Sequence, residues 1–208
     1  MFEAVLPVNA FELIRDRGPR LKAFYLAGGT GLALQLGHRR SADLDFFTPR
    51  QFNADSLLEA IHPDRVDAVE EGTVHCEIDT VKLTFLFHGQ PPVQPLIPWN
   101  GIRIADWRDI TAEKFKTIAQ RGSKRDFFDL FAVIKTRLTI AAACECFKDR
   151  FAATGINMYH VLKSLVYFDE AEGEPDPVLA ETAGPWKWDG VKRFFADNIR
   201  TFEQHLVS

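Results

Sequence analysis

The sequence predicts an α+β protein, in which a mixed β-sheet flanked by helices is followed by a C-terminal helical region. In roughly the first hundred residues, short apolar runs bounded by glycine, proline and aspartate alternate with helical patterns. Further along, apolar residues recur at helical spacing. Residues 89–101 contain four prolines and are expected to form a rigid connection. We therefore expect a sheet-containing core over residues 1–105 and a helical region over residues 106–208.

Composition limits the classes of protein that fit. A chain of 208 residues with 46% hydrophobic content can bury a sizeable core. A formal net charge of −4 argues against a protein coated in basic residues for non-specific nucleic-acid binding, although a local basic groove remains compatible with it. Cys76, Cys144 and Cys146 lack the paired spacing of a zinc site, so reduced thiols are expected. The absence of a leader pattern and of long apolar runs predicts a cytoplasmic protein without membrane spans.

The most informative stretch begins with a strand, a glycine turn and a helix. Phe24–Ala27 is a short apolar run ended by Gly28 and Gly29, as expected of a buried strand whose exit turn passes close to a ligand. Thr30 would begin the helix, whose free N–H groups and positive end lie beside the turn. A phosphate would be held there, with the Thr30 hydroxyl as a further donor.

Two acids follow this helix. Asp43 and Asp45 are two residues apart in a segment that reads as a strand, so their carboxylates share one face. Two adjacent carboxylates repel each other unless a cation lies between them, and hard oxygen ligands suit Mg²⁺ bridged to phosphates. A glycine turn and an Asp-x-Asp pair are each common alone. Their presence in one unit, with Arg39 and Arg40 between them, favours a phosphate and metal site.

The rest of the first region is expected to contain an N-terminal helix, a second helix capped by Asn53 or Asp55, and a three-stranded meander. These elements are predicted at residues 1–21, 53–62, 66–69, 73–78 and 81–87. Residues 102–104 can return to the sheet. In the second region, helices are predicted from the cap Thr111 to Arg121 and after Ser123, and then at 140–151, 156–168 and 189–206, with an exposed loop at 169–185.

Charged and aromatic residues of the helical region have two interpretations each. Asp126 and Asp129 lie three residues apart on one helix face, and the simplest role for Asp129 is a surface ion pair with Arg125, worth about 0.3–0.5 kcal/mol. Trp186 and Trp188 would either stack on nucleic-acid bases or, as the favoured interpretation, pack into the core.

Two groups of residues resemble a known family. The first group comprises Gly28-Gly29-Thr30, Leu32, Gly37-His38-Arg39, Ser41 and Asp43-Leu44-Asp45-Phe46-Phe47. It resembles the signature of the AbiEii/AbiGii nucleotidyltransferase-like toxins, within the DNA polymerase β-like superfamily. The second group, in the expected order, comprises Glu113-Lys114, Arg121-Gly122, Arg125-Asp126 and Asp129-Leu130. The resemblance implies a nucleotidyltransferase core and the toxin half of a type IV toxin–antitoxin or abortive-infection system.

The resemblance also implies roles for individual residues. The residues expected to bind the nucleoside triphosphate (NTP) are Gly28, Gly29, Thr30, Arg39 and Lys114. Asp43 and Asp45 would hold Mg²⁺, with Mn²⁺ as an alternative, and Asp126 would orient the acceptor or the lysine. The chemistry agrees, because a lysine is a compact charge suited to phosphate oxygens. Asp129 is expected to be structural, joined to Arg125 or Arg121.

A third carboxylate is often present on a neighbouring strand in polymerase-β-like transferases. Here the corresponding strand offers Lys82 and Thr84, and only Glu77 on the preceding strand would substitute. A solvent-facing position is the favoured interpretation for Glu77. The site would then work with Asp43 and Asp45 alone.

The leading hypothesis is a Mg²⁺-dependent enzyme that transfers a nucleoside monophosphate from an NTP to RNA. The resemblance implies a tRNA 3′ end as acceptor and a cognate antitoxin as partner. A cationic set would guide the RNA backbone, or would simply be solvated: Arg39, Arg40, Lys114, Lys116, Arg121, Lys124 and Arg125. Two alternatives are transfer to a protein hydroxyl and a nucleotide-binding or partner-binding module without turnover. The absence of an obvious third carboxylate keeps the last alternative open.

Overall fold

The computed structural model describes residues 1–207 and divides into two compact units. Unit 1 comprises Met1–Gln35 and Arg40–Asp106, and unit 2 comprises Leu36–Arg39 and Trp107–Ser208. Unit 1 contains a mixed sheet with helices, whereas the regular elements described in unit 2 are helices, which confirms the predicted α+β class. No helix within residues 1–207 is both long and apolar enough to cross a membrane.

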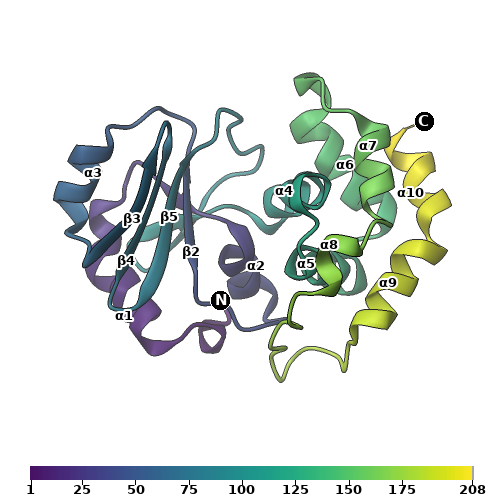
Figure 1. Ribbon diagram of the computed structural model, residues 1–208, viewed down its shortest axis with the longest axis horizontal. Helices are drawn as coiled ribbons and strands as arrows, with labels where there is room; N and C mark the ends of the chain where they lie inside the picture. The colour runs from purple at the N-terminus through teal and green to yellow at the C-terminus, as the bar shows by residue number, and fades with distance from the viewer. Residues whose placement is uncertain (208) are drawn as a thin grey trace. The chain divides into compact units, whose positions relative to one another are not determined.

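Unit 1 is built on a seven-stranded sheet in the order β3-β4-β5-β2-β1-β7-β6. Figure 1 shows β3, β4, β5 and β2 side by side. The strands are β1 Tyr25–Leu26, β2 Leu44–Thr48, β3 Arg65–Glu70, β4 Thr73–Ile78, β5 Val81–Phe87, β6 Ile97–Trp99 and β7 Ile102–Ile104. The β2–β5 and β1–β7 pairs are parallel and the other pairs are antiparallel. The predicted meander and the return of residues 102–104 to the sheet are thus confirmed.

The longer helices of unit 1 are α1 Val8–Arg17, α2 Gly28–Leu36 and α3 Ala54–Ile61. Single 3₁₀ turns lie at Glu3–Val5 and Gly18–Arg20. The side chain of Asn53 caps α3 by accepting a hydrogen bond of 2.8 Å from the Ser56 N–H. The helix ends at Ile61 and is followed by its C-cap residue His62, which has a left-handed φ of 47°. Asn53 is therefore the cap, as one of the two predicted candidates.

Strand β2 sets the orientation of the acidic segment. Leu44, Phe46 and Thr48 are buried, and the alternate residues Asp45 and Phe47 are half-buried. The ring of Phe46 stacks on that of Phe85, with 5.4 Å between their centroids. Because a one-residue slip would exchange the two faces, burial of this apolar row fixes Asp45 on the opposite face of the sheet.

The proline-rich connection ends in a short edge strand. Residues 97–99 form β6, which pairs in antiparallel fashion with β7. Pro98 is tolerated because β6 is an edge strand, where a missing N–H removes no bond to an outer neighbour. The prediction excluded a helix or a central strand for residues 89–101, and a short edge strand agrees with it.

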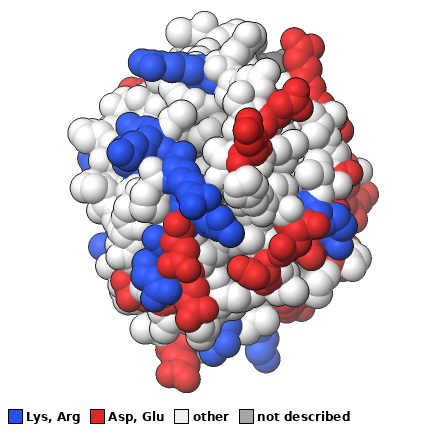
Figure 2. All heavy atoms as spheres, turned by 90° about the vertical axis from the view of Figure 1, so that its left-hand side faces the viewer, with Lys and Arg blue, Asp and Glu red and all other residues white. Residues whose placement is uncertain are grey.

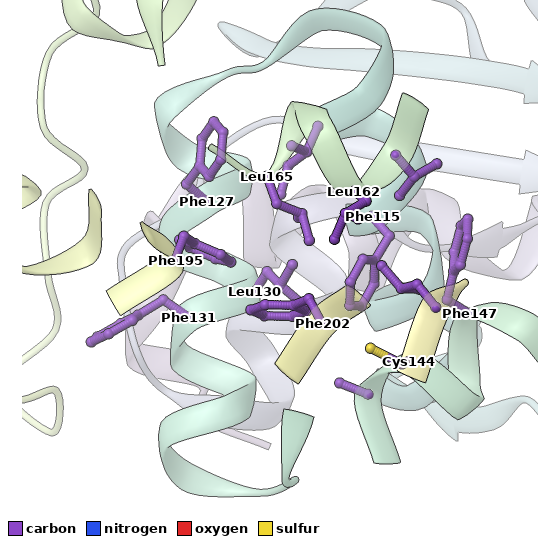
Figure 3. Packing of buried hydrophobic residues seen from close by; sticks show 14 of the residues in the cluster. Phe115, Phe127, Leu130, Phe131, Cys144, Phe147, Leu162, Leu165, Phe195 and Phe202 are labelled. Atoms are coloured by element: carbon purple, nitrogen blue, oxygen red, sulfur yellow. The ribbon is translucent and has the colours of Figure 1, made fainter. Parts of the chain in front are cut away.

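Unit 2 is a group of helices packed around a phenylalanine-rich core (Figure 3). The helices are α4 Trp107–Arg121, α5 Lys124–Thr136, α6 Ile140–Phe151, α7 Met158–Ser164, α8 Asp169–Glu172, α9 Trp188–Asp197 and α10 Ile199–Leu206, with a 3₁₀ turn at Ala152–Thr154. Phe115, Phe127 and Phe202 are completely buried in this core. Trp188 is 7% exposed and belongs to the same cluster, so the favoured interpretation of core packing is confirmed for Trp188.

Three boundaries in unit 2 differ from the sequence-based expectations. Helix α4 begins at Trp107, so Thr111 lies inside the helix and its hydroxyl donates to the Trp107 carbonyl at 2.7 Å. The predicted loop at 169–185 contains the short helix α8. The predicted last helix is divided into α9 and α10 at Asn198, whose amide side chain donates to the Phe194 carbonyl at 2.8 Å. Local hydrogen bonding of this kind competes with a continuous helix.

Acidic and basic side chains are interspersed on the surface of unit 1. Figure 2 shows one face on which groups of both signs lie next to each other. Arg65 illustrates the pattern, because its guanidinium pairs with Asp67 at 2.5 Å and with Glu77 at 3.0 Å. This face does not have the uniformly basic coat typical of non-specific nucleic-acid binding.

Candidate active site

The glycine turn between β1 and α2 is present where the sequence predicts it. Gly28 has a φ of +59°, a left-handed conformation that glycine adopts without the strain caused by a Cβ atom. The Gly31 N–H donates to the Ala27 carbonyl at 2.9 Å and starts the helical hydrogen bonding. The N–H groups of residues 28–30 therefore precede the first intrahelical bond, at the positive end of α2. This end of the helix can accept a phosphate group.

The carboxylate of Asp45 lies directly against this turn. A Cβ atom placed on Gly28 would lie 3.1 Å from the Asp45 Cβ and 3.2 Å from its Cγ, and closer still to Oδ2. The pairing of β1 with β2 explains the approach, because the Ala27 N–H donates to the Asp45 carbonyl at 2.9 Å. The structure thus brings together two features that the sequence predicts separately.

Asp43 immediately precedes β2 and is exposed. Only Leu44 separates it from Asp45, and two positions apart is the spacing at which side chains of an extended chain share a face. The prediction placed Asp43 within the strand, whereas the strand begins one residue later, at Leu44.

Thr30 fastens the start of α2 to the acidic segment. It is 1% exposed, and its hydroxyl donates to the Asp43 carbonyl and lies 2.7 Å from the Ser41 hydroxyl. A hydroxyl has a single proton to donate. The hydroxyl proton of Thr30, which was predicted to donate to phosphate, is therefore used in the hydrogen bond to the Asp43 carbonyl. The backbone N–H of Thr30 remains as the donor for a phosphate.

The donor set fits Mg²⁺. Within residues 1–207, no group of three or more histidine, cysteine, aspartate or glutamate side chains is gathered in a way that would hold a metal ion by itself. Mg²⁺ commonly takes only one or two carboxylates from a protein, and completes its octahedron with water and substrate phosphate oxygens. Asp43 and Asp45, next to the positive end of a helix, match this pattern.

The neighbouring strand supplies no third acid in register with Asp45. Asp45 pairs with Thr84 of β5, whose hydroxyl lies 3.2 Å from His75 Nδ1 on β4. Glu77 lies on β4 opposite Lys82, two strand spacings or about 10 Å from β2. Its carboxylate is paired with Arg65. This arrangement favours the interpretation of Glu77 as a surface strand residue.

In unit 2, five charged or titratable side chains form a buried ionic cluster, which we call the Asp129 cluster. Its members are His38, Arg39, Lys114, Asp126 and Asp129. Arg39 forms a two-pronged contact with Asp129, from Nε at 2.6 Å and from Nη2 at 3.0 Å. Lys114 Nζ lies 2.6 Å from Asp126 Oδ1 and 2.7 Å from Asp129 Oδ2. The cluster joins the segment after α2 to helices α4 and α5.

Ion pairing keeps the acids and the lysine of this cluster charged. Burial opposes ionisation of Asp129, but Arg39, Lys114 and the hydrogen bond from His38 outweigh it and hold the pKa of Asp129 well below its usual value. Burial likewise opposes the charge on Lys114, but Asp126 and Asp129 raise its pKa. Burial also opposes the charge on Asp126, but Lys114 and the exposed Arg121 lower its pKa.

His38 is the uncharged member of the cluster. Burial lowers its pKa and outweighs the hydrogen bond and the charge of Asp129, which act in the opposite direction. Its Nε2 lies 2.7 Å from Asp129 Oδ1, so the neutral ring carries its proton on Nε2 and donates it to the carboxylate. Nδ1 is buried without a hydrogen-bond partner. A protonated ring would leave a second N–H donor unsatisfied there, which also favours the neutral form.

Several sequence-based assignments change in the light of this cluster. Asp129 was expected to pair with Arg125 or Arg121 at the surface. It is completely buried and binds Arg39, His38 and Lys114 instead. Arg121 pairs with Asp126, at 3.1 Å. The helix periodicity did not reveal burial, although the run of apolar neighbours in α5 was a signal for it.

The predicted cationic set is not one exposed surface. Arg39, Lys114 and Lys124 are 3%, 4% and 5% exposed, and each is paired with an acid. Lys124 contacts Asp176 at 3.1 Å. Arg40 and Arg125 remain exposed. The predicted contact of Arg39 with nucleotide therefore competes with a two-pronged buried ion pair.

Lys114 and Asp126 contact each other directly, which is compatible with a role for Asp126 in orienting the lysine.

No role was predicted from the sequence for His38, which the structure places in the Asp129 cluster. Its position beside Arg39 in the first signature was the available signal.

Comparison with known proteins identifies similar sequences and folds. The family model described as nucleotidyl transferase AbiEii toxin, type IV TA system, matches residues 13–85 and 77–203. An uncharacterized protein of Aquifex aeolicus, aq_aa25, is 34% identical over 187 residues, which cover 86% of this chain and 87% of the relative.

Two solved structures share the fold. The nucleotidyltransferase toxin MenT4 of Mycobacterium tuberculosis superposes with a TM-score of 0.54 at 15% identity, over 93% of this chain and 86% of MenT4. JHP933 of Helicobacter pylori gives a TM-score of 0.53 at 17% identity, over 96% of this chain and 92% of JHP933. At these identities the likeness concerns the fold alone.

Proposed function

The chain belongs to the AbiEii nucleotidyl transferase toxin family of type IV toxin–antitoxin systems, and from this we propose that it transfers a nucleoside monophosphate from an NTP to RNA with Mg²⁺. Membership establishes the nucleotidyltransferase class. The metal, the triphosphate site and the acceptor are the finer parts of the proposal.

The observation that carries the proposal is the contact of Asp45 with the Gly28 turn. It brings the carboxylate that we propose as a metal ligand next to the positive end of α2, so a metal ion and a polyphosphate would share one small volume. Phosphoryl-type transfer depends mainly on such positioning and charge neutralisation, because the protein has little covalent chemistry to perform.

Each part of this site has a distinct task. The backbone N–H groups of residues 28–30 would bind phosphate oxygens and orient the triphosphate. Asp43 and Asp45 would hold Mg²⁺, which supplies neutralisation of charge on the phosphate oxygens. Thr30 would keep the helix end and the acidic segment at a constant separation through its bond to the Asp43 carbonyl. The contact of Lys114 with triphosphate stays a prediction from the second signature.

RNA is the acceptor class that we propose, and the 3′ end of tRNA is the candidate to test first. The family resemblance supports this choice, as do the exposed side chains of Arg40 and Arg125, because arginine suits the phosphates of an RNA backbone. The toxin class of the family supports a cognate antitoxin that neutralises the resulting growth inhibition.

The test is a labelling experiment. The protein is incubated with Mg²⁺, total RNA and cell extract, together with each NTP labelled on the α-phosphate in turn, and labelled macromolecules are separated. We expect label on RNA, and loss of that label in the Asp43→Ala variant. Asp149→Ala, which removes an exposed acid on α6, is the matched control and should retain labelling. Label confined to protein would contradict the RNA acceptor, and NTP binding without transfer would contradict turnover.

A further inference from the structure

Unit 1 contains a pocket of about 280 Å³, which no part of the proposed transfer uses. We call this cavity the basic pocket. Its polar lining residues come from separate segments of the chain. The residues that matter here are Lys22, Tyr25, Thr48, Arg50, Leu96 and Arg103. Part of its wall comes from Pro92 and Leu96, in the proline-rich connection that the sequence singled out.

The basic pocket lies at the other end of the strands from the candidate active site. In the antiparallel pair of β1 and β2, Tyr25 is opposite Phe47, whereas the Ala27 N–H bonds to the Asp45 carbonyl. The chain therefore enters β1 beside the basic pocket and leaves it at Gly28. From Asp43 to Thr48 the five residues of extended chain span about 16 Å. The two sites are separate.

All of the charged side chains that line the basic pocket are positive. Lys22, Arg50 and Arg103 line the pocket, and no aspartate or glutamate does. Within residues 1–207 none of these three side chains forms a salt bridge with an acid. Three uncompensated cations around one cavity create a positive potential that favours an anion.

The backbone holds part of this lining in place. Arg103 Nη2 donates to the Lys22 carbonyl, which ties β7 to the chain entering β1. The Arg50 N–H donates to the Thr48 hydroxyl at 3.3 Å, which shapes the turn after β2. The prolines at the wall limit backbone freedom, so a ligand would need to order little of the surrounding chain.

We propose that the basic pocket binds a phosphate group, with Lys22, Arg50 and Arg103 as its cationic ligands. Arginine matches phosphate oxygens with two parallel N–H donors, and lysine adds a compact charge. A volume of about 280 Å³ accommodates a phosphate with part of an attached sugar rather than a whole NTP. The same chemistry is offered by a small phosphorylated molecule and by one phosphate of a single RNA strand.

The experiment is a titration followed by ¹H–¹⁵N NMR of the full chain. The probes are inorganic phosphate, adenosine 5′-monophosphate and a short single-stranded oligoribonucleotide, each added without Mg²⁺ to weaken binding at the acidic pair. We expect the amide signals of residues 22–25, 48, 50 and 103 to shift with saturation. Shifts confined to residues 28–30 would overturn the proposal, because they would place the phosphate at the active site only.

Variants test the assignment of the ligands. Lys22→Gln combined with Arg50→Gln removes two exposed cations without touching the buried walls, and should weaken phosphate binding at the basic pocket by at least about 10-fold. Arg15→Gln removes an exposed arginine of unit 1 outside the pocket and should leave the affinity unchanged. Equal affinity of the double variant and the native protein would overturn the proposal, provided that their melting temperatures agree.

The probes also identify the source of the phosphate. Tighter binding of the oligoribonucleotide than of the mononucleotide supports an RNA strand, and equal affinities support a small phosphorylated ligand. Binding of none of the three probes at the basic pocket overturns the proposal. These results are independent of the labelling experiment, so failure of the transfer and failure of the basic pocket are distinguishable.

Discussion

The carboxylate of Asp45 lies against the backbone of Gly28, in the space that a Cβ atom would occupy. Two constraints therefore act on the same glycine, namely its left-handed φ of +59° and the acid beside it. The first constraint concerns folding, and the second concerns the proposed metal site.

The Gly28→Ala variant tests both constraints, the first through the free energy of unfolding and the second through the rate of nucleotide transfer. Strain at positive φ costs about 1–3 kcal/mol of unfolding free energy, and the new methyl group must also displace the Asp45 carboxylate. We expect nucleotide transfer to fall by more than the loss of folded protein explains. Denaturant unfolding and labelling of RNA are the measurements.

Gly155→Ala is the control for backbone strain. Gly155 also has a positive φ, of +76°, but no atom lies within 4 Å of the position of an added Cβ. The variant should lose about 1–2 kcal/mol of stability and retain transfer per folded molecule. Equal loss of transfer in both variants would contradict the role of the Asp45 contact.

Asp45→Asn should weaken Mg²⁺ binding while preserving shape. The amide keeps the size of the carboxylate but loses the charge that a hard cation requires. We expect transfer to stop when EDTA removes metal from the native protein and to return with added Mg²⁺. The variant should need a higher Mg²⁺ concentration for half-maximal rate. An unchanged Mg²⁺ requirement would exclude Asp45 as a metal ligand.

Lys114→Met should destabilise unit 2. Removal of Lys114 leaves Asp126 with Arg121 and Asp129 with Arg39, so the buried cluster has one positive charge too few. Loss of one partner from a buried ion pair typically costs about 3–5 kcal/mol. Lys163→Met, which changes an exposed lysine of α7, should alter stability by no more than about 0.5 kcal/mol. Chemical denaturation of both variants provides the comparison. Stability of Lys114→Met equal to that of the control would contradict the structural role of the cluster.

His38 should give the folded protein a pH-dependent stability. An unfolded histidine has a pKa of about 6.5, and burial lowers the pKa of His38 in the folded chain. Below about pH 6.5 the unfolded state therefore takes up a proton that the folded state does not. The unfolding free energy should therefore decrease as the pH is lowered below about 6.5, with a slope of at most about 1.4 kcal/mol per pH unit. Above about pH 6.5, protonation of His38 should have no effect on the unfolding free energy.

The matched variant is His38→Gln, whose amide can still donate to Asp129 but does not titrate. Its stability should depend less on pH between the lowered pKa of His38 and about 6.5. His205→Gln, in α10, serves as the control. If the pH profiles of His38→Gln and the native protein coincide, His38 is not held neutral in the folded state.

The local signals in the sequence were sufficient for the α+β class and for most of the elements of unit 1. Alternating burial in β2 and the cap at Asn53 follow from short-range chemistry, which neighbouring residues decide among themselves. The same is true of the turn at Gly28, where a position that demands positive φ is occupied by glycine. Family membership was also readable from two short signatures in order.

Tertiary structure alone decided which charges meet. Asp129 was assigned a surface pair because helix spacing places Arg125 four residues away, but its actual partners are 15 to 91 residues distant along the chain. Because these side chains are buried, the charge of each must be neutralised by other members of the cluster. The contact of Asp45 with Gly28 likewise depends on the pairing of β1 with β2, since sequence spacing shows which groups are available but not which strands come together.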